Sequence, residues 1–234
     1  MEEVEEGRYS RVNALASTYW TLCRTNALVH LRDRARSFQQ PSGSFERAEL
    51  GRSSDDAGLI AIVFGAMCVE AGAFDYAAIH LGDKYTRQNL DKLDLVSKWT
   101  IVTRLVTGKI LRSDGKALQY LRALVRARNQ LVHVKSVPLV FDELTPSFFQ
   151  RHEKEFCEAV EMSCRAVYCL AAEIRLLHGR SPSPLWWVKL DDPRSFDDMD
   201  QDPRMAGFRL EATQYRDQCA VDGSPEVASG QPRL

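Results

Sequence analysis

The sequence predicts an all-α protein: an antiparallel helical bundle of about five helices with a poorly ordered C-terminal tail. Apolar residues recur every three or four positions in several long segments, and stretches rich in Pro, Gly and Ser separate these segments. With 234 residues and 44% hydrophobic residues, the chain is long enough to bury one core. We expect a helical domain over residues 1–180 and an acidic, Pro- and Asp-rich, partly disordered tail over 181–234.

The first two helices are predicted on either side of a polar stretch. Residues 8–38 have apolar residues at helical spacing with arginines between them. The stretch "QQPSGSFERAELGRSS", residues 39–54, is rich in loop-forming residues and should be a surface loop. Asp55 or Asp56 is then available to cap a second helix over 56–81.

Three glycines recur at seven-residue intervals in this second helix: Gly58, Gly65 and Gly72. Seven residues bring a helix round to within about 20° of the same face. Glycine inside a helix costs about 1 kcal/mol relative to alanine, so three on one face predict that another backbone approaches closely there.

The most apolar run, "LIAIVFGAMCV" at 59–69, also lies in the second helix. Glu70, Asp75 and His80 interrupt its continuation before it reaches the roughly 20 apolar residues that a bilayer requires, so we expect a core helix and no membrane association. The acidic start "MEEVEEG" lacks the layout of a secretory signal, which predicts a cytoplasmic location.

Two further helices are predicted over 90–108, ending at Gly108, and over 114–135. In the second of these, Arg128 interrupts an otherwise apolar stripe. A polar residue at such a position requires a structural or a functional reason.

The last long helix of the bundle has clear signals at both ends. Thr145 followed by Pro146 is typical of a helix start, and the helix should run to His178 with Gly179 ending it. A short helix around 208–215 is compatible with the composition of the tail.

The stretch "RARNQLVHVK", residues 126–135, places Arg128, Asn129 and His133 close together late in a helix. An Arg-Asn pair followed four residues later by a His is expected about 0.01 times by chance in a chain of this composition, so the motif supports a functional hypothesis. The alternative is structural, with Arg128 and His133 interacting with the dipole of the helix C-terminus.

This motif resembles the Arg-Asn-x-x-x-His signature of the HEPN (higher-eukaryote and prokaryote nucleotide-binding) superfamily. The segments "VEAGAFDYAAIHLGD" and "LDLVSKW" resemble its preceding helices, and "RNQLVHVKS" followed by a long helix resembles its closing half. The resemblance covers about residues 8–178. It implies a helical bundle, often dimeric, in which many members cleave RNA without a metal ion and others only bind or scaffold.

Carried over by position, the resemblance implies that Arg128 and His133 form a catalytic pair, with Asn129 as the supporting polar residue that orients the histidine. Glu70 corresponds to an acidic position that varies within the family, and it is a supporting candidate. An antitoxin or sensor protein is a further partner that such toxin or antiviral-defence proteins can have.

The residue types suit this chemistry independently. Cleavage by the RNA's own 2′-hydroxyl requires a group that exchanges a proton near neutral pH, as the imidazole of His133 can. The guanidinium of Arg128 can stabilise the charge that gathers on the phosphate oxygens. Five residues along a helix place these two side chains about 140° and about 7.5 Å apart, so Arg128 must bend round the helix, the helix must end early, or a second copy must complete the site. The geometry leaves these three options open, and the last agrees with the dimeric habit of the family that the motif resembles, so the resemblance implies a homodimer.

A strongly basic stretch surrounds the motif, which predicts that RNA phosphates would be attracted there. The candidate RNA-binding residues are Lys116, Arg122, Arg126 and Lys135. Residues 101–136 contain eight basic residues against the single acid Asp114, whereas residues 185–234 contain ten acids against six bases. The acidic tail could therefore compete with RNA for this surface, or simply be solvated.

The sequence thus favours a metal-independent endoribonuclease of the toxin or defence type that would leave 2′,3′-cyclic phosphate and 5′-hydroxyl ends. The alternatives are a non-catalytic helical module that binds RNA, a nucleotide or a protein partner, and a pure oligomeric scaffold. Neither the scattered histidines nor the six cysteines show the spacing of a zinc site, so no metal or cofactor is predicted, and the cysteines are expected to be core residues.

Overall fold

The computed structural model describes residues 15–132, 145–179, 184–190 and 202–222, and these contain helices and no strand. The predicted all-α class is therefore confirmed. The elements in chain order are α1 (Ala16–Ser37), α2 (Phe45–Leu81), α3 (Asp83–Tyr85), a π-helical turn (Thr86–Leu90), α4 (Leu95–Thr107), α5 (Lys116–Val132), α6 (Pro146–His178) and α7 (Pro203–Asp222).

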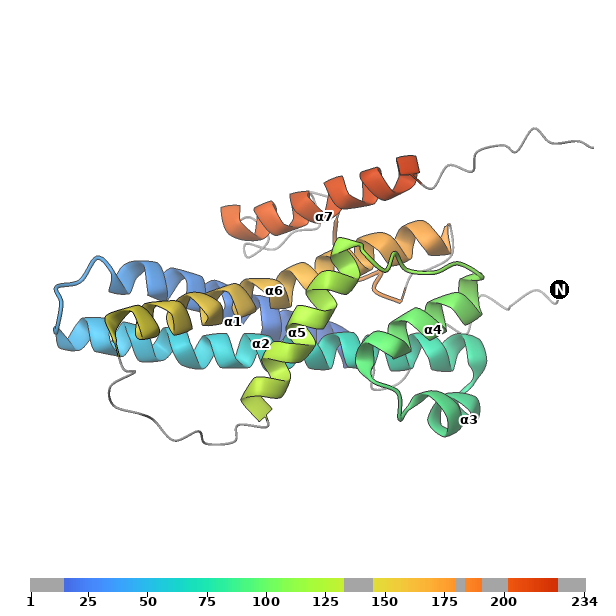
Figure 1. Ribbon diagram of the computed structural model, residues 1–234, viewed down its shortest axis with the longest axis horizontal. Helices are drawn as coiled ribbons and strands as arrows, with labels where there is room; N and C mark the ends of the chain where they lie inside the picture. Colours follow the sequence, from blue (N-terminus) through green and yellow to red (C-terminus); the bar gives the residue numbers. More distant parts are fainter. Residues whose placement is uncertain (1–14, 133–144, 180–183, 191–201, 223–234) are drawn as a thin grey trace, which may run out of the picture.

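The long helices α1, α2 and α6 lie side by side and form the body of the molecule (Figure 1). Helix α5 crosses this body obliquely, α4 and α3 lie at one end of it, and α7 runs along the outer side of α6. The five predicted helices correspond to α1, α2, α4, α5 and α6, and their apolar faces share one core. The largest fully buried side chains include Trp99, Tyr76, Tyr168, Leu121 and Ile174.

Helix α2 begins eleven residues before the predicted start at residue 56, so the loop predicted over 39–54 is largely wrong. The Ser44 hydroxyl accepts a hydrogen bond from the backbone N–H of Arg47 at 3.2 Å and caps the helix, in place of Asp55 or Asp56. Two serines in this segment are compatible with a helix because their hydroxyl groups find hydrogen-bond acceptors on α1. Ser54 Oγ donates to the carbonyl of His30 at 3.1 Å, and Ser53 Oγ donates to Asp33 at 2.9 Å.

The three glycines of α2 face neighbouring elements at close range, but the atoms nearest to them belong to side chains and not to the backbone that was predicted. A Cβ on Gly58 would lie 2.7 Å from the ring of Phe156, and one on Gly65 would lie 3.0 Å from the Cβ of Ser163. Both of these neighbours belong to α6. The missing side chains therefore allow α2 and α6 to pack closely over several turns.

Helices α4 and α6 show how well end signals predict boundaries. Helix α4 begins at Leu95, five residues after the predicted start, where Asp94 caps it by accepting the backbone N–H of Ser97 at 3.0 Å. Gly108 ends the helix with a left-handed φ of 72°. Helix α6 has the predicted bounds: Thr145 accepts the backbone N–H of Phe148 at 3.2 Å, and a glycine follows His178. The part of the predicted fourth helix beyond Val132 lies outside the described residues.

Helix α7 is longer than the short helix expected around 208–215, and it belongs to the core. Its inward side chains are buried: Met205, Phe208, Ala212, Tyr215 and Cys219. The carboxylate of Glu173 on α6, which is 1% exposed, accepts the hydroxyl of Tyr215 at 2.6 Å and the backbone N–H of Arg112 at 2.7 Å. Helix α7 is therefore fixed by apolar burial and by a buried polar network.

Within the described part of the chain, α2 is the single helix long and apolar enough to cross a membrane. More than half of its most apolar window is buried against its neighbours, so α2 is a core helix of the bundle. The cysteines fit a core role as well. All six are free, five are buried, and burial raises the pKa of Cys169 to about 12.

Candidate functional site

The motif residues Arg128 and Asn129 lie in the last turns of α5, where that helix crosses α2. The apolar face of α5 is buried through Leu121, Leu124 and Ala127, and the next residue, Arg128, lies at its edge with a side chain that is 30% exposed. The guanidinium Nη1 of Arg128 donates to the Oδ1 of Asn129 at 3.0 Å. The asparagine therefore orients the arginine that precedes it.

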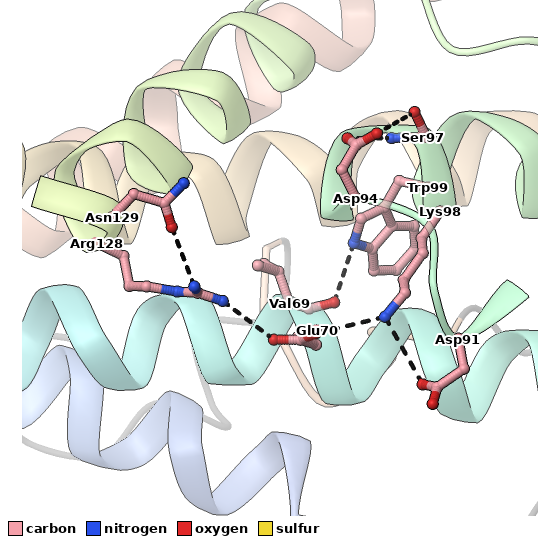
Figure 2. A network of polar contacts seen from close by, with 9 residues as sticks. All are labelled: Val69, Glu70, Asp91, Asp94, Ser97, Lys98, Trp99, Arg128 and Asn129. Carbon is pink, nitrogen blue, oxygen red and sulfur yellow. Dashed lines mark hydrogen bonds and ion pairs between the residues drawn. The ribbon is translucent and has the colours of Figure 1, made fainter. Parts of the chain in front are cut away.

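Glu70 of α2 contacts the other end of the same guanidinium (Figure 2). Its Oε2 lies 3.4 Å from the Nη2 of Arg128. The structure thus brings together three predicted site residues, Arg128, Asn129 and Glu70, although the sequence separates Glu70 from Arg128 by 58 positions. The remaining catalytic candidate, His133, lies outside the described residues, as does Lys135.

Lys98 of α4 is a fourth member of this group that the sequence analysis missed. Its Nζ lies 3.4 Å from the Oε1 of Glu70 and 3.9 Å from the Oδ1 of Asp91. The side chain is only 9% exposed, and Lys98 lines a small pocket together with Phe74, Leu90 and Val102. One signal was present: Lys98 falls among Leu95, Trp99 and Val102 at helical spacing, so it interrupts an apolar face as Arg128 does.

A neighbouring hydrogen bond holds α4 in place against α2. The indole Nε1 of Trp99, which is fully buried, donates to the carbonyl of Val69 at 3.0 Å (Figure 2). Because Val69 and Trp99 immediately adjoin Glu70 and Lys98 in sequence, this bond fixes the backbones that carry the two charged groups. A line of polar contacts thus runs from α5 through α2 to α4 and the turn before α4, and we term it the polar chain: Asn129, Arg128, Glu70, Lys98 and Asp91.

The polar chain contains two cations and two anions, so its formal charges cancel. Arg128 and Glu70 are partly exposed, with 30% and 43% of their side chains accessible, and water screens their attraction. The arginine is therefore held near a carboxylate but remains accessible from solvent. An incoming phosphate would compete with Glu70 for the same guanidinium.

The predicted RNA-binding residues occupy different settings along α5. Arg122 and Arg126 are exposed, and the guanidinium of Arg122 donates to the carbonyl of Ser113 at 3.0 Å. They share an outward stripe with Asn129, since these three positions follow one another at intervals of four and three residues. Lys116 lies about 18 Å from Arg128 along the helix. Its Nζ is 2.9 Å from a carboxylate oxygen of Glu211 on α7, so the acidic C-terminal segment does pair with one residue of the basic stretch.

The described residues contain no group of three or more His, Cys, Asp or Glu side chains that could hold a metal ion. His30, His80 and His178 are largely enclosed within the bundle, and burial lowers the pKa of each. His152 is exposed near the start of α6, where its ring contacts Phe148. None of these four histidines belongs to the polar chain.

Comparison of the chain with protein-family models, with curated proteins and with solved structures finds no match. The fold and the site together define an all-α bundle with an arginine-centred polar site where α2, α4 and α5 meet.

Proposed function

We propose that this protein is a metal-independent endoribonuclease of the toxin or defence type. The observation that carries the proposal is the arrangement of Arg128, which is partly exposed at the end of α5 and is oriented by both Asn129 and Glu70. The Arg-Asn-x-x-x-His motif supports the proposal from the sequence. In this role, Arg128 binds the scissile phosphate and His133 exchanges the proton of the 2′-hydroxyl or of the leaving oxygen.

The electrostatic setting supports RNA as the substrate. Arg122 and Arg126 are exposed on the same helix as Arg128, and they present their charges along a stripe that leads towards the motif. A phosphate backbone lying along α5 would contact these guanidinium groups before it reached Arg128. Binding of this kind weakens steeply as salt is added, because it depends on the release of counterions.

A second copy of the chain completes the site in this proposal. Exposed apolar residues border the polar chain. Met67, 37% exposed, lies about one turn before Glu70, and Val132, 56% exposed, lies about one turn after Arg128. Ile60, 38% exposed, continues the same face of α2. Burying these side chains between two copies would place two motifs opposite each other across a two-fold axis.

The test is incubation of the purified protein, with a chelator present, on total RNA. We expect cleavage products that carry 2′,3′-cyclic phosphate and 5′-hydroxyl ends. His133→Ala should lower the rate by about 10²- to 10⁴-fold, the usual contribution of a general acid or base, and should leave the fold intact. His152→Ala, which removes an exposed imidazole outside the site, is the matched control and should cleave at the wild-type rate.

Equal cleavage by wild type and His133→Ala would refute the assignment. Salt-sensitive RNA binding without cleavage would instead identify a non-catalytic RNA-binding module. An absence of both binding and cleavage would leave an oligomeric scaffold or a module for a different partner.

A further inference from the structure

We propose that Lys98 is a positioning residue that allows Glu70 to release Arg128 to a substrate phosphate. The inference rests on the proposed function, because it concerns how the same arginine becomes available. It assigns to Glu70 the role of an internal anion that occupies Arg128 in the free protein, and to Lys98 the role of the partner that Glu70 keeps.

The geometry of Glu70 suggests this exchange. Its two carboxylate oxygens are divided between two cations, with Oε2 at 3.4 Å from Arg128 Nη2 and Oε1 at 3.4 Å from Lys98 Nζ. Charge-assisted hydrogen bonds of full strength are about 2.7–2.9 Å long. Glu70 is therefore shared between two cations and closely bound to neither.

The two cations differ in their freedom to move. Lys98 is 9% exposed, its stem is enclosed, and the adjacent Trp99 is bonded to the α2 backbone. Arg128 is 30% exposed and has a longer planar fork that suits phosphate oxygens. When a phosphate approaches, Arg128 is the partner that can turn away, while Lys98 stays beside the carboxylate.

Lys98 thereby lowers the cost of releasing Arg128. With Lys98 present, Glu70 remains paired after Arg128 has moved to the phosphate. Without it, the departure of Arg128 would leave an unpaired carboxylate beside an arriving phosphate, and like charges repel. Lys98→Met should therefore hold Arg128 more firmly on Glu70, and should weaken RNA binding although Lys98 itself does not contact the RNA.

A merely structural role for Lys98 predicts a different pattern. If the lysine only packed α4 against α2, its replacement would change stability and would affect RNA binding equally whatever residue stands at position 70. A double-mutant cycle between positions 70 and 98 separates the two roles. Glu70→Gln removes the internal anion but keeps the size of the side chain, so no competitor for Arg128 remains.

The probe is a short 2′-O-methylated RNA of mixed sequence, which lacks the attacking hydroxyl and is not cleaved. We expect Lys98→Met to bind it about two- to fivefold more weakly than Lys92→Met, the range that a partly exposed ion pair can supply. Lys92 is an exposed lysine six residues earlier, so its replacement corrects for the loss of one positive charge. In the Glu70→Gln background, Lys98→Met and Lys92→Met should bind equally. An undiminished penalty for Lys98→Met in that background would overturn the inference.

A measurement without RNA distinguishes failure of this inference from failure of the proposed function. NMR reports the rotation of the Arg128 guanidinium about its Cζ–Nε bond, and the signal is assigned by its loss in Arg128→Lys. Rotation should be slower in Lys98→Met than in wild type, because Glu70 then has one partner. Unchanged rotation refutes the role of Lys98 even if RNA is bound, whereas slower rotation without any RNA binding refutes the ribonuclease proposal alone.

Discussion

Replacing Tyr215 with Phe should test whether α7 is an integral part of the bundle. The ring, 5% exposed, would keep its apolar contacts, and only the hydroxyl that donates to Glu173 at 2.6 Å would be lost. A hydrogen bond to a charged group contributes about 1.5–3 kcal/mol, and the carboxylate left behind is 1% exposed and still accepts the backbone N–H of Arg112. We therefore expect the free energy of unfolding to fall by about 2 kcal/mol.

The environment of Glu173 determines the size of this loss. Burial raises the pKa of this carboxyl, and the two hydrogen bonds that it accepts oppose the rise. Removing the Tyr215 hydroxyl should raise the pKa further, so part of the lost stability can be recovered by protonating Glu173 at lower pH. In a Glu173→Gln background, Tyr215→Phe should change the free energy of unfolding little, because no charge remains at position 173 for the hydroxyl to stabilise.

The assay is urea unfolding followed by tryptophan fluorescence, with hydrogen exchange of α7 amides as a local readout. For a chain of this size, 2 kcal/mol corresponds to a fall in Tm of about 4–8 °C. Tyr85→Phe, at a 44% exposed position, is the control and should change stability by less than about 0.5 kcal/mol. If Tyr215→Phe also changed the free energy of unfolding by less than about 0.5 kcal/mol, the hydrogen bond to the buried carboxylate would not be anchoring α7.

Three other predictions follow from packing, capping and buried histidines. Gly65→Val should lower the free energy of unfolding by about 1–3 kcal/mol through overpacking against α6, measured by urea unfolding, and an unchanged midpoint would contradict the close packing. Ser44→Ala should cost about 1 kcal/mol through loss of the α2 cap, with Ser44→Asp restoring most of it; failure of that rescue would argue against capping. Burial lowers the pKa of His30, His80 and His178 below 6.5, so these histidines bind protons more tightly in the unfolded chain than in the folded one. Stability should therefore be complete above about pH 7 and fall as the pH drops below 6.5, by at most about 4 kcal/mol per pH unit, and a urea midpoint that rose on acidification would contradict this.

Local signals predicted those parts of the fold that depend on neighbouring residues. Thr145, Pro146 and Gly179 set the ends of α6 where the sequence placed them, because caps act within one turn. The start of α2 was misplaced since the polar residues after Ser44 favour a loop when considered alone. Their hydroxyls are satisfied by α1, from Asp33 and His30, and no local pattern reveals such partners.

The candidate site divides in the same way. Arg128 and Asn129 are adjacent and form a motif that the sequence displays directly. Glu70 was found through a family resemblance, and its contact with Arg128 depends on how α2 and α5 cross. Lys98 could have been noticed as a charge on an apolar face, but its pairing with Glu70 depends on a third helix docking beside the other two.

The packing of α7 against the bundle determines whether the molecule stays together after proteolysis. Met205 and Ala212 are fully enclosed, and Glu211 joins Lys116, Tyr120 and Arg165 from two other helices. A protease that severed the backbone between α6 and α7 would therefore yield two fragments that stay associated, co-elute on a sizing column and separate only in denaturant. A recombinant chain ending before residue 202 would instead expose the apolar surface that α7 covers and should precipitate.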